Sequence, residues 1–199
     1  VQDGLRSKDA DHLPSETPAA WQRRRAYWQK ALADIAAIPV DQLSPEERLN
    51  AAVLTESLRA NVTGIGWKTY EAPLNSDTFF WSSLKPYSAL EDAADYRRYL
   101  GRLKDGPRWF DEHMANMRAG MKRGYTVPRV SLEGRDKTIV PFTQTGEKNP
   151  LWEPFANMPD SIPAAEREAM RAEGRRLIDG TMAPAYARVL AFMQGEYMP

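Results

Sequence analysis

Two helix starts marked by proline in the first third of the sequence constrain the fold more than any other feature. Thr17 precedes Pro18, an arrangement in which threonine caps the helix and proline, which lacks an N–H, takes the first helical position. Ser44-Pro45-Glu46-Glu47 is a capping box, in which the serine hydroxyl and the second glutamate each accept a backbone N–H. Apolar residues at helical spacing follow both starts. The sequence therefore predicts two helices, over residues 18–38 and 45–63.

The middle of the chain indicates two more helices with a break between them. Ser88-Ala89-Leu90-Glu91 has the pattern of a second capping box, and Gly106-Pro107 is a pair that interrupts most helices. A stripe of methionines in the second helix is typical of a core-facing side, and Gly124 fits the left-handed position that ends a helix. The helices predicted here cover residues 89–104 and 107–123.

The last third of the chain is again rich in helix-forming Ala, Glu and Arg. Gly180 and Pro184 interrupt it, so we expect one long kinked helix or two helices in line over residues 163–197. The stretches 65–87 and 125–162 hold turn-forming residues without the alternation of a strand. The predicted fold is all-α: an irregular bundle of about five main helices with two long loops. We expect a single domain over residues 1–199.

The composition excludes several kinds of site and partner. The 27 Lys and Arg residues balance the 27 Asp and Glu residues, so the electrostatic case for nucleic acid or an anionic membrane as partner is absent. There is no cysteine, which excludes disulfides, thiolate metal sites and a cysteine nucleophile. No apolar run is long enough to span a bilayer. The polar first residues predict no signal peptide in this chain, with a mature secreted form as the alternative.

The motifs of the common enzyme classes are also missing. A catalytic zinc needs three protein ligands, and the two histidines, His12 and His113, share no ligand spacing. For His113 we expect a partly buried, hydrogen-bonded histidine on a helix flank. No nucleophile elbow and no glycine-rich phosphate loop occurs, and neighbouring carboxylates on a helix point in different directions. We therefore expect no catalytic, cofactor-binding or metal-binding residue in this chain.

One segment, residues 67–87, is unusually rich in aromatic side chains and is called here the aromatic segment. It has two interpretations: a wall of a ligand cleft, or a loop that anchors itself on the helices with large rings. On the first interpretation, basic side chains of the following loop join the aromatic ones. The candidate cleft-lining residues are Trp67, Tyr70, Phe80, Trp81, Tyr87, Arg129 and Arg135.

A long run in the middle of the chain resembles the bacterial proteins grouped as domain of unknown function 885. The run is DYRRYLGRLKDGPRWFDEHMANMRAGMKRGYTVPRV. The positions that carry the resemblance are Tyr96, Tyr99, Leu100, Arg102, Leu103, Pro107, Gly124 and Pro128. The flanking segments LSPEERLNAAVLTESL, NPLWEPFANMP and MAPAYARVLAFMQGEYMP are similar to further parts of the family pattern. The resemblance extends over almost the whole chain.

The resemblance implies that this chain corresponds to the N-terminal half of a longer helical protein. Family members resemble all-helical zinc metallopeptidases of the gluzincin kind, whose metal-binding motif belongs to the second half of the pattern. It follows that zinc is the cofactor implied for the longer relatives, with none in this chain. The resemblance favours the cell envelope as location, periplasmic or as a lipoprotein, with the cytoplasm as the alternative.

Two functional hypotheses remain open at this point. The first is the N-terminal lobe of a metallopeptidase-like hydrolase, which forms one wall of a substrate cleft without the catalytic metal motif. The alternative is a non-catalytic helical module that binds a peptide or a partner protein. The expected partners are the remaining C-terminal half of the same polypeptide and a second copy of the chain. For the dimer we expect contact through the C-terminal helix or the aromatic segment.

Overall fold

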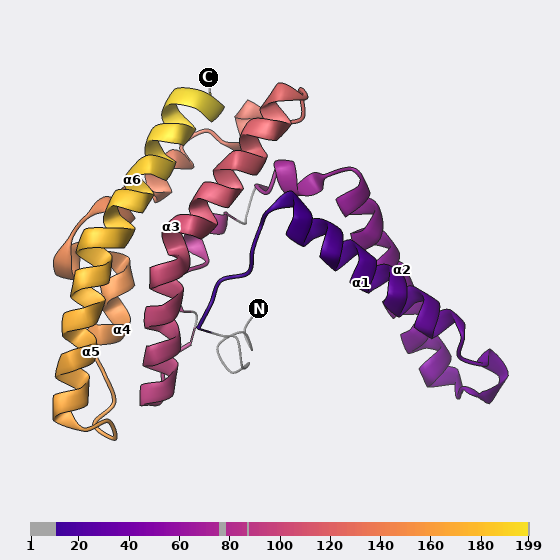
Figure 1. Cartoon of the computed structure of the whole chain (residues 1–199), viewed down its shortest axis with the longest axis horizontal. Helices are drawn as coiled ribbons and strands as arrows, with labels where there is room; N and C mark the ends of the chain where they lie inside the picture. Colours follow the sequence, from indigo (N-terminus) through magenta and orange to yellow (C-terminus); the bar gives the residue numbers. More distant parts are fainter. Residues whose placement is uncertain (1–10, 76–78, 87, 199) are drawn as a thin grey trace.

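The computed structural model describes residues 11–75, 79–86 and 88–198, and within these ranges it is all-α, with no strand (Figure 1). This confirms the predicted fold class. Short 3-10 turns connect many of the helices. The α-helices are α1 (Pro18–Ala36), α2 (Pro45–Gly66), α3 (Ala93–Lys122), α4 (Glu153–Ala156), α5 (Ala164–Leu177) and α6 (Ala183–Phe192).

Both predicted helix starts in the first third are confirmed. The Thr17 hydroxyl accepts a hydrogen bond from the Ala20 N–H at 3.3 Å, and Pro18 is the first residue of α1. At α2 the capping box is complete: Glu47 N–H donates to the Ser44 hydroxyl, and Ser44 N–H donates to the Glu47 carboxylate at 2.8 Å. Each cap uses groups within three residues of one another, so a local sequence pattern is sufficient to predict it.

The third helix differs from the prediction at its start. It begins at Ala93 rather than residue 89, and Asp92 is the cap: its carboxylate accepts the Asp95 N–H at 2.9 Å. The Asp95 carboxylate in turn accepts the Glu91 N–H at 3.0 Å. This aspartate pair therefore replaces the predicted capping box, which was wrong.

The predicted break at Gly106-Pro107 was also wrong, because α3 runs through it as one helix of 30 residues. An internal proline costs roughly 3 kcal/mol. Leu103 and Phe110, which lie on either side of Gly106-Pro107, are both fully buried in the same core. Their packing offsets the cost of the proline. A Cβ atom at Gly106 would lie 2.5 Å from the Met182 sulfur, so the glycine permits close approach of the C-terminal helix rather than a break.

The C-terminal helical region continues from α5 to α6 through a π-helical turn, Ile178–Met182, and ends with a second one, Met193–Tyr197. Of the two arrangements expected for residues 163–197, the structure has helical segments joined in line. The first π turn ends two positions before Pro184, whose missing N–H would otherwise leave a gap in the helical ladder.

The core lies between α3 and the α5–α6 line, and buried tyrosines fix the long loops onto it. The Tyr186 hydroxyl donates to the Trp81 carbonyl at 2.6 Å, and the Tyr99 hydroxyl donates to the Leu151 carbonyl at 3.0 Å. Gly124 has a φ of +70° just after α3, the left-handed conformation predicted for it. We call α3–α6 and the turns packed on them the body.

The α1–α2 pair projects from the body as a helical hairpin, which we call the hairpin (Figure 1). Of its helical residues only Ala20 in α1 and Ile65 in α2 are buried, and both lie near the base. No helix within the described ranges is long and apolar enough to cross a membrane.

Candidate functional site

The structure places two of the predicted cleft-lining residues inside the core. Trp81 is fully buried and donates its indole N–H to the Thr138 hydroxyl at 3.0 Å. Phe80 is buried against Trp81 in an edge-on contact, with ring centroids 5.1 Å apart. These contacts favour the anchoring interpretation for the central part of the aromatic segment.

The other predicted residues that the structure describes lie on separate elements and differ in burial, and they do not line one cleft. Tyr70 is buried and stacks on Trp21 of α1, with centroids 5.3 Å apart. Trp67 caps the end of α2 and is 71% exposed. Arg129 is exposed, whereas the half-buried Arg135 lies 5.6 Å from the centroid of the Phe79 ring. Tyr87 lies outside the described residues.

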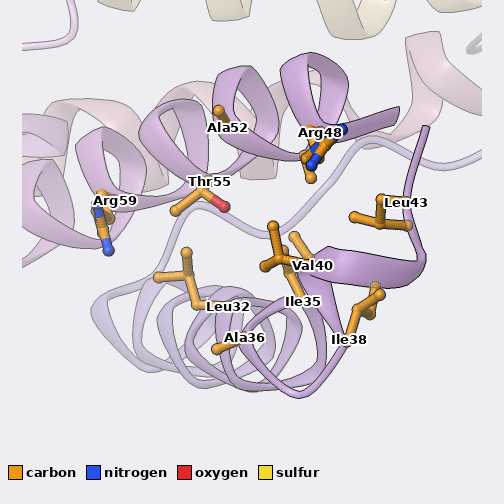
Figure 2. Close-up of a pocket in the computed structure, with 11 residues that line it drawn as sticks. Leu32, Ile35, Ala36, Ile38, Val40, Leu43, Arg48, Ala52, Thr55 and Arg59 are labelled. Carbon is orange, nitrogen blue, oxygen red and sulfur yellow. The ribbon is translucent and has the colours of Figure 1, made fainter. Parts of the chain in front are cut away.

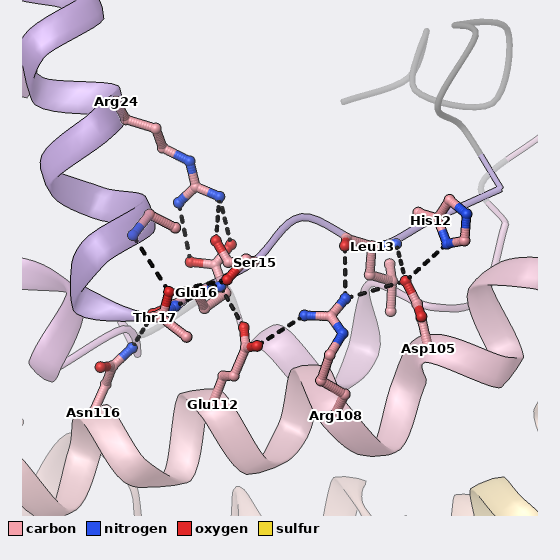
Figure 3. A network of polar contacts seen from close by, with 11 residues as sticks. His12, Leu13, Ser15, Glu16, Thr17, Arg24, Asp105, Arg108, Glu112 and Asn116 are labelled. Atoms are coloured by element: carbon pink, nitrogen blue, oxygen red, sulfur yellow. Dashed lines mark hydrogen bonds and ion pairs between the residues drawn. The ribbon is translucent and has the colours of Figure 1, made fainter.

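A buried polar junction, which the sequence did not indicate, joins the hairpin to α3 (Figure 3). Arg24 of α1 pairs with the buried carboxylate of Glu16 at 3.1 Å. The Glu16 N–H donates to the Glu112 carboxylate at 2.5 Å, and its carbonyl accepts from the Asn116 amide at 2.6 Å. Burial raises the pKa of Glu16, and the hydrogen bond from Arg24 opposes this rise. The junction therefore fixes the base of the hairpin.

His113 lies next to this junction and is buried in an aromatic cage. Its ring stacks on the Phe80 ring, with ring centroids 4.4 Å apart. It also makes an edge-on contact with the Trp109 ring, with ring centroids 4.6 Å apart. Both ring nitrogens are buried without a hydrogen-bond partner, so the expected hydrogen-bonded histidine was wrong in that respect. Burial lowers the pKa of His113 to about 4, which keeps the ring neutral at neutral pH.

The described residues do not fit a zinc site. No group of three or more His, Asp or Glu side chains among them is close enough to hold a metal ion. His12 lies at the surface with Nδ1 3.4 Å from the Asp105 carboxylate, and His113 is enclosed by aromatic rings. A zinc ion needs at least three protein ligands with an orienting shell around them, which neither histidine has here.

A groove of about 410 Å³ with a largely aliphatic lining lies between α1 and α2, near the tip of the hairpin (Figure 2). Leu32 and Ile35 of α1 face small residues of α2, and this difference in side-chain size leaves the space open. We call this space the groove. Its lining residues are Leu32, Ile35, Ala36, Ile38, Val40, Leu43, Arg48, Ala51, Ala52, Thr55 and Arg59.

Two arginines are the charged groups of the groove. Arg48 and Arg59 are exposed residues of α2, eleven positions apart. Arg59 donates to the Glu56 carboxylate of its own helix at 2.6 Å. The groove therefore combines an aliphatic interior with positive charge near each end, a combination suited to an apolar segment that carries carboxylates.

Exposed large apolar side chains are concentrated on the same hairpin. The described chain has nine of them, and seven lie between residues 27 and 67. This concentration of exposed apolar side chains on one helical pair favours the hairpin as the place of an interaction site. The seven are Tyr27, Ile38, Val40, Leu49, Val53, Leu54 and Trp67.

A second cavity, of about 550 Å³, lies in the body beside α5, and charged side chains make up more of its lining than of the groove's. Arg175 stacks over the Trp152 ring at 4.7 Å and lies 3.4 Å from the Glu147 carboxylate. An arginine with an ion-pair partner is present in both spaces, and the aliphatic lining of the hairpin groove makes it the stronger candidate for binding an apolar segment.

Comparison with known proteins gives one family match. The model of a family described as "Bacterial protein of unknown function (DUF885)" matches residues 1–199. No curated protein and no solved structure matches the chain. The match extends from the hairpin to the end of the body, so both regions belong to the family pattern.

Proposed function

This chain belongs to the DUF885 family of bacterial proteins, and we propose that it is a helical lobe that binds an apolar protein segment in the groove of its hairpin. The observation that carries this proposal is the groove itself, about 410 Å³ of space lined by aliphatic side chains on an otherwise exposed helical pair. A helical hairpin of this kind gains most of its stability from what its apolar face packs against.

The chemistry of the groove favours an amphipathic helix as the bound segment. Helix-in-groove recognition places apolar side chains at helical spacing into an aliphatic cleft, and polar groups at the rim fix the direction. Here Leu32 and Ile35 supply the apolar wall, while Arg48 and Arg59 attract carboxylates near the two ends. The bound helix should therefore carry an aliphatic stripe between acidic residues.

A labelling experiment tests this function, because the chain has no cysteine of its own. Ala52→Cys places an environment-sensitive fluorophore in the groove, and Ser57→Cys, an exposed α2 position outside the groove lining, is the matched control. A synthetic amphipathic helix with a leucine stripe between glutamates should shift the emission of the first label and not of the second. The same peptide with lysine in place of glutamate should bind more weakly.

Leu32→Asp provides the second arm of this test. A carboxylate at this position in the groove wall should abolish peptide binding in calorimetry with unlabelled chain. Binding that survives Leu32→Asp, or an equal emission shift at Ala52→Cys and Ser57→Cys, would contradict the proposal.

A second candidate function, the wall of a substrate cleft in a metal-dependent hydrolase, is supported by Trp67. Its indole is 71% exposed at the base of the hairpin, where the Arg123 guanidinium lies 3.3 Å from its carbonyl. An exposed ring so close to the body can stack on a substrate. In a longer, active polypeptide Trp67→Ala should raise KM and leave kcat unchanged; an unchanged KM would contradict this role.

A further inference from the structure

The second helix of the hairpin carries an apolar ridge in addition to its groove-facing side. Leu49 and Val53 lie four positions apart on one side of α2 and are 64% and 60% exposed. Each follows a groove-lining residue by one position, Arg48 and Ala52 respectively, and so lies about 100° further around the helix. We call Leu49 and Val53 the ridge.

Acidic residues flank the ridge along the same side of the helix. Glu46 and Glu56 lie three positions before Leu49 and three positions after Val53, a helical spacing that keeps all four on one side. The two glutamates are ten residues apart, or about 15 Å along the axis. Both are exposed, as the ridge is.

The groove has the opposite charges at nearly the same spacing. Arg48 and Arg59 are eleven residues apart, about 16 Å along the axis. The groove thus offers an aliphatic slot between two cations, and the ridge offers two aliphatic side chains between two anions. Both are parts of α2, so the hairpin is complementary to itself.

We propose that the segment bound in the groove is α2 of a second copy of this chain, which identifies the partner and rests on the proposed function. The two α2 helices run antiparallel across a two-fold axis, so the ridge of each copy enters the groove of the other. In this arrangement Arg59 exchanges its ion pair with Glu56 of its own helix for Glu46 of the second copy, and the released Glu56 faces Arg48 of the second copy. Such an interface is isologous and closes at two copies.

The dimensions of the hairpin are sufficient for a stable interface. Helix α2 has 22 residues, about 33 Å of length, and α1 has 19, about 28 Å. A standard interface needs roughly 800 Å² from each partner. Two hairpins side by side provide four helices of this length for such an interface.

The test is sedimentation velocity of the full chain with matched variants. Wild type should sediment as a dimer at tens of micromolar, and Val53→Glu should weaken dimerisation at least tenfold by placing a carboxylate in the groove. Val130→Glu is the control: Val130 is 76% exposed on the body, so its replacement should leave the dimer unchanged. Circular dichroism of each variant is the check that it remains helical.

Charge reversal tests the orientation of the two helices. Arg59→Glu should weaken the dimer, and Glu46→Arg in the same chain should restore it by re-forming the pair with the sign reversed. A double variant as weak as Arg59→Glu alone would overturn the antiparallel arrangement. A dimer that tolerates Val53→Glu would overturn the proposal, because its interface would then lie elsewhere.

The two proposals fail in distinguishable ways. A monomeric wild type that still binds the synthetic acidic helix at the Ala52→Cys label would overturn the dimer and leave the groove as a site for a different partner. A monomeric wild type that binds no such peptide would overturn both.

Discussion

The hairpin and the body each contain a long helix that begins with a side-chain cap, yet the two regions bury their side chains very differently. Helix α3 of the body buries thirteen of its 30 residues, whereas α2 of the hairpin buries one of its 22. Both helices carry apolar residues at helical spacing. The difference teaches that an amphipathic pattern identifies a face that needs a partner, without saying whether the partner lies in the same chain.

The largest expected difference between the regions comes from the same substitution made in each. Leu103→Ala removes a fully buried side chain from α3 and should lower the free energy of unfolding by about 2–5 kcal/mol. Leu49→Ala removes a side chain that is 64% exposed and should change it by less than about 0.5 kcal/mol. Urea unfolding at a concentration that keeps the chain monomeric checks both values, and equal losses would contradict the division into body and hairpin.

His113, which lies next to the polar junction between the hairpin and the body, should make the free energy of unfolding depend on pH. Burial lowers the pKa of His113 to about 4, against about 6.5 in an unfolded chain. Between these values the unfolded chain binds a proton that the folded chain does not, so stability falls as pH falls from 6.5 to 4 and is fully present above 6.5. The loss amounts to about 3 kcal/mol.

His113→Phe is the variant that isolates this effect, because a phenyl ring keeps the stack on Phe80 and cannot titrate. The difference in unfolding free energy between wild type and His113→Phe should change across pH 4 to 6.5 and be constant above it. A constant difference over the whole range would show that the His113 ring is not enclosed as described.

Replacing a glycine by alanine should also lower stability more in the body than in the hairpin, but by less than the loss expected for Leu103→Ala. A Cβ atom at Gly120 would lie 2.6 Å from the Tyr125 carbonyl oxygen and 2.8 Å from that of Glu71, and backbone atoms cannot easily move away. Gly120→Ala should therefore cost about 1–3 kcal/mol. At Gly66 in the hairpin the nearest atom is an Arg25 guanidinium nitrogen at 3.4 Å, an ordinary contact, so Gly66→Ala should cost little. Thermal melts of the two variants measure both losses of stability. A larger loss for Gly66→Ala than for Gly120→Ala would contradict this prediction.

The smallest expected effect concerns the tip of the hairpin. Ser44→Ala removes the hydroxyl that accepts the Glu47 N–H and should cost about 1 kcal/mol of local helix stability. Amide exchange should therefore accelerate in the first turns of α2 and stay unchanged in α3. Acceleration in both helices would mean that the hairpin and the body unfold as one unit.

Local signals in the sequence were sufficient for the helix starts of the hairpin and for the helix end at Gly124. Each of these depends on groups within a few residues, so the pattern Ser44-Pro45-Glu46-Glu47 determines its own hydrogen bonds. The start of α3 is also local, since Asp92 and Asp95 cap it, but the predicted capping box at Ser88 was the wrong one of two neighbouring cap patterns. The passage of α3 through Pro107 was not predictable in this way, because it depends on the packing of Gly106 against Met182, which is 76 positions further along the chain.

The candidate site was harder to predict than the fold, for two physical reasons. Glu16 and Glu112 are joined by a hydrogen bond across 96 positions, and no local pattern reports such a pairing. Leu49 and Val53 have the spacing of core residues, so the sequence did not distinguish an exposed ridge from a buried one. In the aromatic segment the same limit applies, because Trp67 is exposed and Trp81 is fully buried.

Hydrogen–deuterium exchange of the wild-type chain at two concentrations tests the central claim most directly. Protection of the α1 and α2 amides should increase when the chain concentration rises from about 1 µM to about 50 µM, because pairing with a second copy stabilises the hairpin by mass action. Protection of the α3 amides, which depends on contacts within the chain, should not change. Hairpin protection that is independent of concentration, or that changes in parallel with α3, would contradict a hairpin completed by a second copy.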